Sequence, residues 1–184
     1  QPESVDFLFF MTRHQYVDVR AGSETLLSRF AQESPQDADE LTLKLVQALL
    51  IAGAPDGVPR HTAHVLRTCL SDFLNGFEVK TIWALLESHS ASAQEIGGIL
   101  LHTIDASELE LAEIASLASH EILAVREAAW KLCETQLERL RKDPGPLALV
   151  ADSNWQDSRQ FGFQFLGEHF GNEGALPPDV LIRI

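Results

Sequence analysis

Apolar residues recur along the chain at intervals of three and four, in short blocks that stop before polar turns. This spacing predicts an amphipathic helix in each block. The blocks cover residues 41–51, 79–86, 109–117 and 146–150. A polar turn and a second segment of helical spacing follow each block. The pattern therefore predicts a series of helical hairpins and an all-α fold.

The second segments of the predicted hairpins resemble one another at a spacing near 33 residues. Equivalent positions hold Arg60, Gln94, Arg126 and Arg159, which are 34, 32 and 33 residues apart. Three residues after each of them stands a small residue, namely Ala63, Gly97, Ala129 and Gly162. In the three clearest copies an apolar residue follows three positions later, as Leu100, Leu132 and Phe165. A constant spacing of this kind is typical of helical repeats.

The repeated positions have a structural interpretation. We expect the arginines to lie in the first turn of each second helix and to bond to carbonyls of the turn or to a carboxylate of the adjacent unit. The small residues let neighbouring helices approach closely. Because a glycine inside a helix costs about 1 kcal/mol relative to alanine, close packing is the expected compensation at Gly97 and Gly162.

The segment Val125-Arg126-Glu127-Ala128-Ala129 resembles a HEAT repeat, and the resemblance covers residues 38–184. It implies a right-handed α-solenoid of stacked antiparallel hairpins, with about four repeats in one continuous domain. The second helices would line a concave face. The units carry Gly where the family usually has Ala, and Gln94 replaces the Arg once, which points to a divergent, bacterial-type member.

The two ends of the chain fit this repeat less well. Residues 1–37 are expected to form a helical or irregular cover, or a first repeat, since 7–10 is a continuous apolar run and 16–19 alternates as a strand does. Val180–Ile184 looks like the start of a further first helix. An uncapped last repeat would expose its apolar face, so we expect the chain to be a fragment of a longer protein.

Charge and composition narrow the possible partners. The chain has 27 acidic against 14 basic residues, and no Lys or Arg occurs between Lys80 and Arg126. A phosphate backbone would be repelled there, so nucleic acid is not the expected partner. No apolar run approaches the roughly 20 residues that a membrane span needs, and no secretory signal is seen. The expected location is the cytoplasm, with Cys69 and Cys133 as small buried residues rather than a disulfide.

Catalytic and metal chemistry is weakly supported. His61 and His64 share one helix face and could share a metal, but no residues at matching spacing complete four ligands. HEAT-like iron enzymes repeat His-Glu pairs, whereas this chain has His120-Glu121 and, in the preceding unit, His89-Ser90. Phosphate loops, nucleophile elbows and zinc-protease motifs are missing from the sequence. We therefore expect neither an enzyme nor a bound cofactor.

The resemblance to HEAT repeats implies a scaffold that binds a protein or peptide. The candidate partner-binding residues are Arg60, Gln94, Arg126, Trp155 and Arg159. Trp155 suits either a partner anchor or simple packing over the neighbouring turn. The alternative function is a HEAT-like enzyme or nucleic-acid-processing module whose active groups lie outside this segment.

Overall fold

The computed structural model describes residues 4–171, and within this range the regular secondary structure is all α-helix apart from two short 3-10 helices, with turns and loops between them. The first hairpins are built from α1 (Val5–Thr12), α2 (Val17–Glu33), α3 (Pro35–Leu49), α4 (Val58–Thr68), α5 (Val79–Leu86) and α6 (Ala91–Leu101). Then come α7 (Leu111–Leu117), α8 (Leu123–Thr135), α9 (Leu137–Lys142), α10 (Gly145–Ala151) and α11 (Gln156–Phe170). The all-α prediction is confirmed for these residues. The helix expected at Val180–Ile184 lies outside them.

The predicted first helices correspond to α3, α5, α7 and α10. The bounds of α5 agree with the prediction, and those of α7 and α10 differ by one or two residues. Helix α3 begins at Pro35, six residues before the predicted start, because a proline in the first turn has its backbone angle preset for a helix and needs no amide donor there. The boundary predicted between residues 37 and 38 consequently lies inside α3.

The N-terminal segment is a complete helical hairpin made of α1 and α2. The strand-like alternation at 16–19 does not produce a strand: Tyr16 is the N-cap of α2 and Val17 its first residue. Helical spacing wins because it buries Arg20, Ser23, Leu27 and Phe30 on one face of α2.

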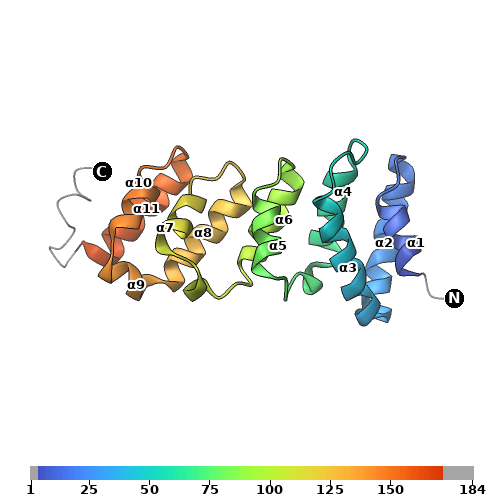
Figure 1. Ribbon diagram of the computed structural model, residues 1–184, viewed down its shortest axis with the longest axis horizontal. Coiled ribbons are helices and arrows are strands. Elements are labelled where there is room, and N and C mark those ends of the chain that lie inside the picture. Colours follow the sequence, from blue (N-terminus) through green and yellow to red (C-terminus); the bar gives the residue numbers. More distant parts are fainter. Residues whose placement is uncertain (1–3, 172–184) are drawn as a thin grey trace. The chain divides into compact units, whose positions relative to one another are not determined.

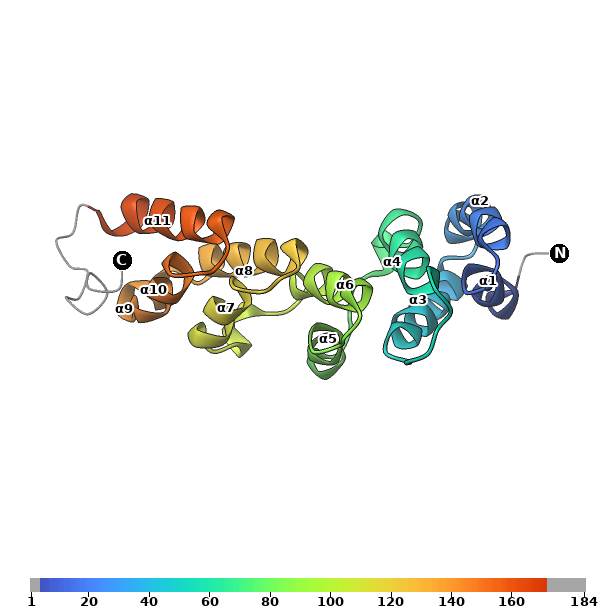
Figure 2. The same ribbon diagram turned by 90° about the horizontal axis from the view of Figure 1, so that it is seen from above.

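The hairpins fall into two compact units, the first ending at Leu100 and the second beginning at Leu101. In the first unit α1 packs against α2 and α3, and α2 packs against α4. In the second unit α7 packs against α8 and α10, and α8 packs against α11. Within each of these groups first helices contact first helices and second helices contact second helices, as Figures 1 and 2 show.

Small residues allow the helices of one hairpin to approach closely. A Cβ added to Gly162 of α11 would lie 2.8 Å from the backbone nitrogen of Ala151 in α10. A Cβ on Gly97 of α6 would lie 3.0 Å from Leu86 Cδ2 in α5. Ala63 and Ala129, at the corresponding predicted positions, are buried as well. The expected role of the small residue is therefore confirmed at the two glycines.

Both cysteines are free thiols within the described part of the chain. Burial raises the pKa of the Cys133 thiol to about 12, so this side chain is a protonated, inert member of the core, as expected. Among residues 4–171 no helix combines the length and the apolar character that crossing a bilayer requires.

Candidate functional site

The turn that leads into each second helix has the same local structure in four hairpins. Its first residue accepts a hydrogen bond from the backbone N–H two positions later. The backbone N–H donor and the side-chain acceptor are, in chain order, Tyr16 and His14 Nδ1 (3.2 Å), Ser90 and Ser88 Oγ (3.1 Å), Ile122 and His120 Nδ1 (3.1 Å), and Trp155 and Ser153 Oγ (3.3 Å). Each bond satisfies an amide at a helix start that has no partner within the helix.

Three arginines reinforce this turn from the fourth position of their helices. Arg20 Nη1 donates to the carbonyls of His14 at 2.8 Å and Gln15 at 3.0 Å. Arg126 Nη1 donates in the same way to the carbonyls six and five residues before it, each at 2.9 Å. Arg159 Nη1 donates to the carbonyl of Ser153 at 2.7 Å. The expected bond from arginine to turn carbonyls is confirmed at Arg126 and Arg159.

Arg126 also connects its hairpin to the next one in the second unit. Its Nη2 and Nε atoms donate to Asp157 Oδ2 of α11 at 2.6 and 3.2 Å. Its guanidinium carbon lies 4.3 Å from the centre of the Trp155 ring, a cation–π geometry. Only 5% of Arg126 is exposed. Its side chain is thus committed to contacts within the protein, as the structural interpretation predicted.

Trp155 packs over the neighbouring turn. Its indole N–H donates to the carbonyl of Ser119 at 3.2 Å, and 39% of the residue stays exposed. Ser158 and Ser153 donate to the carbonyl of Ala118 at 2.5 and 3.2 Å. Of the two interpretations of Trp155, packing over the turn is therefore confirmed, and an anchoring role for its exposed part stays a prediction.

Arg60 does not occupy the position of Arg126, which corrects the alignment drawn from the sequence. It is the third residue of α4 rather than the fourth, and it is exposed. The reason lies at Gly57, which caps α4 with φ +78° and so starts the helix one residue late relative to the arginine. A Cβ on Gly57 would stand 3.0 Å from Arg20 Nη2. Gln94, the fourth residue of α6, is half-buried.

Arg20 is the residue of this set that the sequence comparison missed. The segment His14-Gln15-Tyr16-Val17-Asp18-Val19-Arg20 matches His120-Glu121-Ile122-Leu123-Ala124-Val125-Arg126 in its first residue and in its final Val-Arg pair. This match could have identified Arg20 as the equivalent of Arg126. The strand-like alternation in the same segment concealed it.

The Arg126–Asp157 pair makes stability depend on pH. Hydrogen bonding from Arg126 lowers the pKa of the Asp157 carboxyl. A depressed folded-state pKa means that the unfolded chain takes up the proton first. The pair therefore contributes its full stabilisation above the ordinary aspartate pKa of about 3.9. This stabilisation is lost as the pH falls through the pKa of Asp157 in the folded protein.

We expect the free energy of unfolding to fall less steeply below about pH 4 in Asp157→Asn than in the wild type, because the variant has no carboxylate to protonate. Urea unfolding at stepped pH values measures this. Asp152→Asn, an exposed site nearby, is the matched control and should keep the wild-type slope. Parallel pH profiles for the wild type and Asp157→Asn would contradict the assignment.

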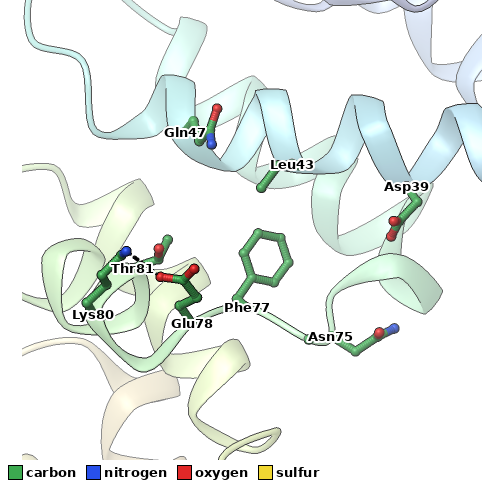
Figure 3. Close-up of a pocket in the computed structure, with 9 residues that line it drawn as sticks. Asp39, Leu43, Gln47, Asn75, Phe77, Glu78, Lys80 and Thr81 are labelled. Atoms are coloured by element: carbon green, nitrogen blue, oxygen red, sulfur yellow. Dashed lines mark ion pairs between the residues drawn. The ribbon is translucent and has the colours of Figure 1, made fainter.

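A second feature of the first unit is a cavity of about 440 Å³ between α3 and the start of α5. Figure 3 shows the Phe77 ring directed toward Leu43 of α3, with Asp39 on the same helix. Lys80 is paired with Glu78 at its rim, and this hydrogen bond raises the lysine pKa. These two charges neutralise each other, so the cavity offers an apolar side wall at Leu43 and Phe77 and one further carboxylate, that of Asp39.

Metal binding finds no support in residues 4–171. No group of three or more His, Cys, Asp or Glu residues in that range is arranged to hold an ion. His120, the member of the single His-Glu pair, has its Nδ1 occupied as a turn acceptor.

Large exposed apolar residues recur at the starts of the second helices. Tyr16 and Val17 at the start of α2 are each 64% exposed, and Leu123 at the start of α8 is 47% exposed. Trp155, the N-cap of α11, belongs to the same set. We call these four residues the helix-entry residues.

A scan of the chain against protein-family models finds no match, and searches of curated proteins and of solved structures find no significant similarity.

Proposed function

We propose that the chain is a HEAT-like module, a right-handed α-solenoid of stacked hairpins, that binds a protein partner at the starts of its second helices. The observation that carries the proposal is the recurrence of exposed apolar side chains at the N-cap or the first residue of a second helix. Single exposed apolar residues are ordinary on any protein surface. Repetition in three hairpins gives them weight, and in the second unit Leu123 and Trp155 stand at the starts of two helices that pack against each other.

The second unit supplies two neighbouring helix starts of this surface. Leu123 and Trp155 begin α8 and α11, two second helices that pack against each other. The Trp155 indole is held by Ser119 and by the Arg126 guanidinium. An aromatic side chain fixed before binding loses little freedom when a partner covers it, and exposed tryptophans are over-represented among residues that dominate binding energy.

The buried turn arginines support the surface without forming it. Arg126 donates hydrogen bonds to two turn carbonyls and to Asp157. The turn is thereby fixed, and with it the direction in which Leu123 and Trp155 are presented. Of the residues selected from the sequence, Trp155 contributes contact area in this proposal, and Arg126 and Arg159 position it.

Affinity capture from a lysate of the source cells tests the proposal. The wild type and Leu123→Glu serve as baits, and Leu149→Glu is the matched control because Leu149 is 43% exposed on α10, a first helix. We expect one stoichiometric protein to remain on the wild type and on Leu149→Glu through a moderate-salt wash, and to be lost from Leu123→Glu, with equal melting temperatures for the three. Retention by Leu123→Glu, equal loss from both variants, or an empty wild-type bait would refute it.

A further inference from the structure

A cavity of about 550 Å³ in the first unit gathers cationic and imidazole side chains from α2 and α4. We propose that this cavity binds a phosphate monoester dianion, held by Arg20, Arg60 and Arg67 with His61 and His64. Val17, a helix-entry residue, also lines this cavity, but the charged and imidazole donors proposed here are not part of the partner surface proposed above. Its positive charge contrasts with that of the chain as a whole, which carries a net charge of −13.

The donors converge because of helical spacing. Arg60, His64 and Arg67 stand four and then three positions apart on α4, which places them along one face of the helix. Arg20 reaches the cavity from α2 and lies against Gly57, the N-cap of α4. Guanidinium groups from two helices therefore face one space.

Arg60 offers the cavity guanidinium donors that the described part of the protein does not use. Among residues 4–171 its guanidinium forms no hydrogen bond or ion pair, and it is exposed. Arg20 differs, since its Nη1 is bound to two turn carbonyls while Nη2 points toward the α4 turn. Arg60 is thus a full planar set of donors available to an oxyanion.

Two carboxylates offset part of this positive charge: Glu95 lines the cavity, and Glu24 lies beside the two histidines. Glu24 Oε1 lies 3.8 Å from His61 Nδ1 and from His64 Nε2, beyond hydrogen-bond length. Glu95 is paired with Arg67, whose side chain is 51% exposed. An exposed ion pair contributes little to stability, so an entering anion can displace it. Three guanidiniums against two carboxylates leave an excess of one positive charge even when both imidazoles are neutral.

The number and placement of the donors favour phosphate over a carboxylate. A phosphoryl group presents three terminal oxygens in a tetrahedral arrangement and carries about two negative charges near neutral pH. The guanidiniums and imidazoles that line the cavity come from two helices and so offer donors from more than one side, whereas a carboxylate offers two oxygens in one plane. A metal ion would be repelled by the same guanidiniums.

Phosphate in the cavity would also change the ionisation of the histidines. Burial lowers the pKa of His61 in the free protein, with Arg20 and His64 adding to the effect and Glu24 opposing it. A dianion among these groups favours the protonated imidazole. The protein is therefore expected to take up protons when phosphate binds. Phosphate that did not bind near the histidines would not cause this uptake.

The test is a titration of the whole chain at about pH 7.5, where phosphate is largely dianionic, followed by the imidazole NMR signals of His61 and His64. The probes are inorganic phosphate, a phosphoserine peptide and the same peptide with aspartate. We expect the imidazole signals to shift and to reach saturation with both inorganic phosphate and the phosphoserine peptide. Arg60→Gln should bind each of them about ten-fold more weakly than the wild type does. Arg29→Gln, which removes an equal charge about two and a half turns further along α2, should bind as the wild type does.

The outcomes separate the sources of the phosphate. Equal affinity for inorganic phosphate and the peptide supports a small phosphate ester as ligand, and at least ten-fold tighter binding of the phosphoserine peptide supports a phosphorylated chain. Absence of saturation, equal losses in Arg60→Gln and Arg29→Gln, or equal affinity for the aspartate peptide would overturn the proposal. Because Leu123→Glu leaves this cavity unchanged, its phosphate binding should match the wild type whatever the fate of the partner surface.

Discussion

Replacing Gly162 with alanine is expected to lower the free energy of unfolding by about 2–3 kcal/mol, the usual cost of forcing extra atoms into a packed core. The added Cβ would lie 2.8 Å from Ala151 N, 2.9 Å from Ala151 Cα and 3.2 Å from Val150 C. All three atoms belong to the backbone of α10. They cannot rotate away as a side chain could, so α10 and α11 must separate.

The same helix contains the matched control. Gly167 of α11 has no atom within 4 Å of an added Cβ. Gly167→Ala should therefore stabilise the protein by about 0.5–1 kcal/mol, because alanine favours the helical conformation more than glycine does. Urea unfolding of both variants measures the two effects. Destabilisation by Gly167→Ala, or no destabilisation by Gly162→Ala, would contradict the packing described for α10 and α11.

Replacing Arg126 with alanine is expected to cost about 2–3 kcal/mol, because a buried guanidinium that donates hydrogen bonds to several acceptors is removed. The change leaves two turn carbonyls without their donor and removes the cation from Asp157 and from the face of Trp155. Arg126→Lys should recover only part of the loss, since one ammonium cannot reach both the carbonyls and the carboxylate.

Arg60→Ala is the matched control for this prediction. It deletes the same side chain from an exposed site and should change the free energy of unfolding by no more than about 0.5 kcal/mol. Chemical denaturation followed by circular dichroism measures both variants. If Arg126→Ala and Arg60→Ala have similar stabilities, the turn arginine is not the structural element described above.

Comparison of Arg60 with Arg126 shows where sequence similarity stops being informative. Both arginines precede a small buried residue by three positions, as the sequence indicated. A helix start, however, depends on backbone conformation. Gly57 adopts φ +78° at the start of α4, whereas Ile122 before α8 is extended. Because of this local difference, Arg60 lies at the surface and not against the turn. The spacing of residues in the sequence does not reveal the difference.

Arg20 illustrates the opposite case, in which the signal was present and a competing pattern hid it. The alternation of Tyr16, Val17, Asp18 and Val19 favours a strand when only four residues are considered. The longer spacing of Arg20, Ser23, Leu27 and Phe30 favours a helix. The helix forms because it buries all four side chains on one face.

The sequence by itself determined the helical hairpins, the positions of α5, α7 and α10, and the small residues at helix contacts, because these follow from the period of the apolar residues and from side-chain size. Tertiary structure decided which arginine is buried and which is exposed, since that choice depends on where each helix begins and on which carbonyls and carboxylates the neighbouring hairpin offers. It also decided the cavity lined by Arg20, Arg60 and Arg67, because those side chains are 40 and 7 residues apart in the chain and meet only when α2 packs on α4.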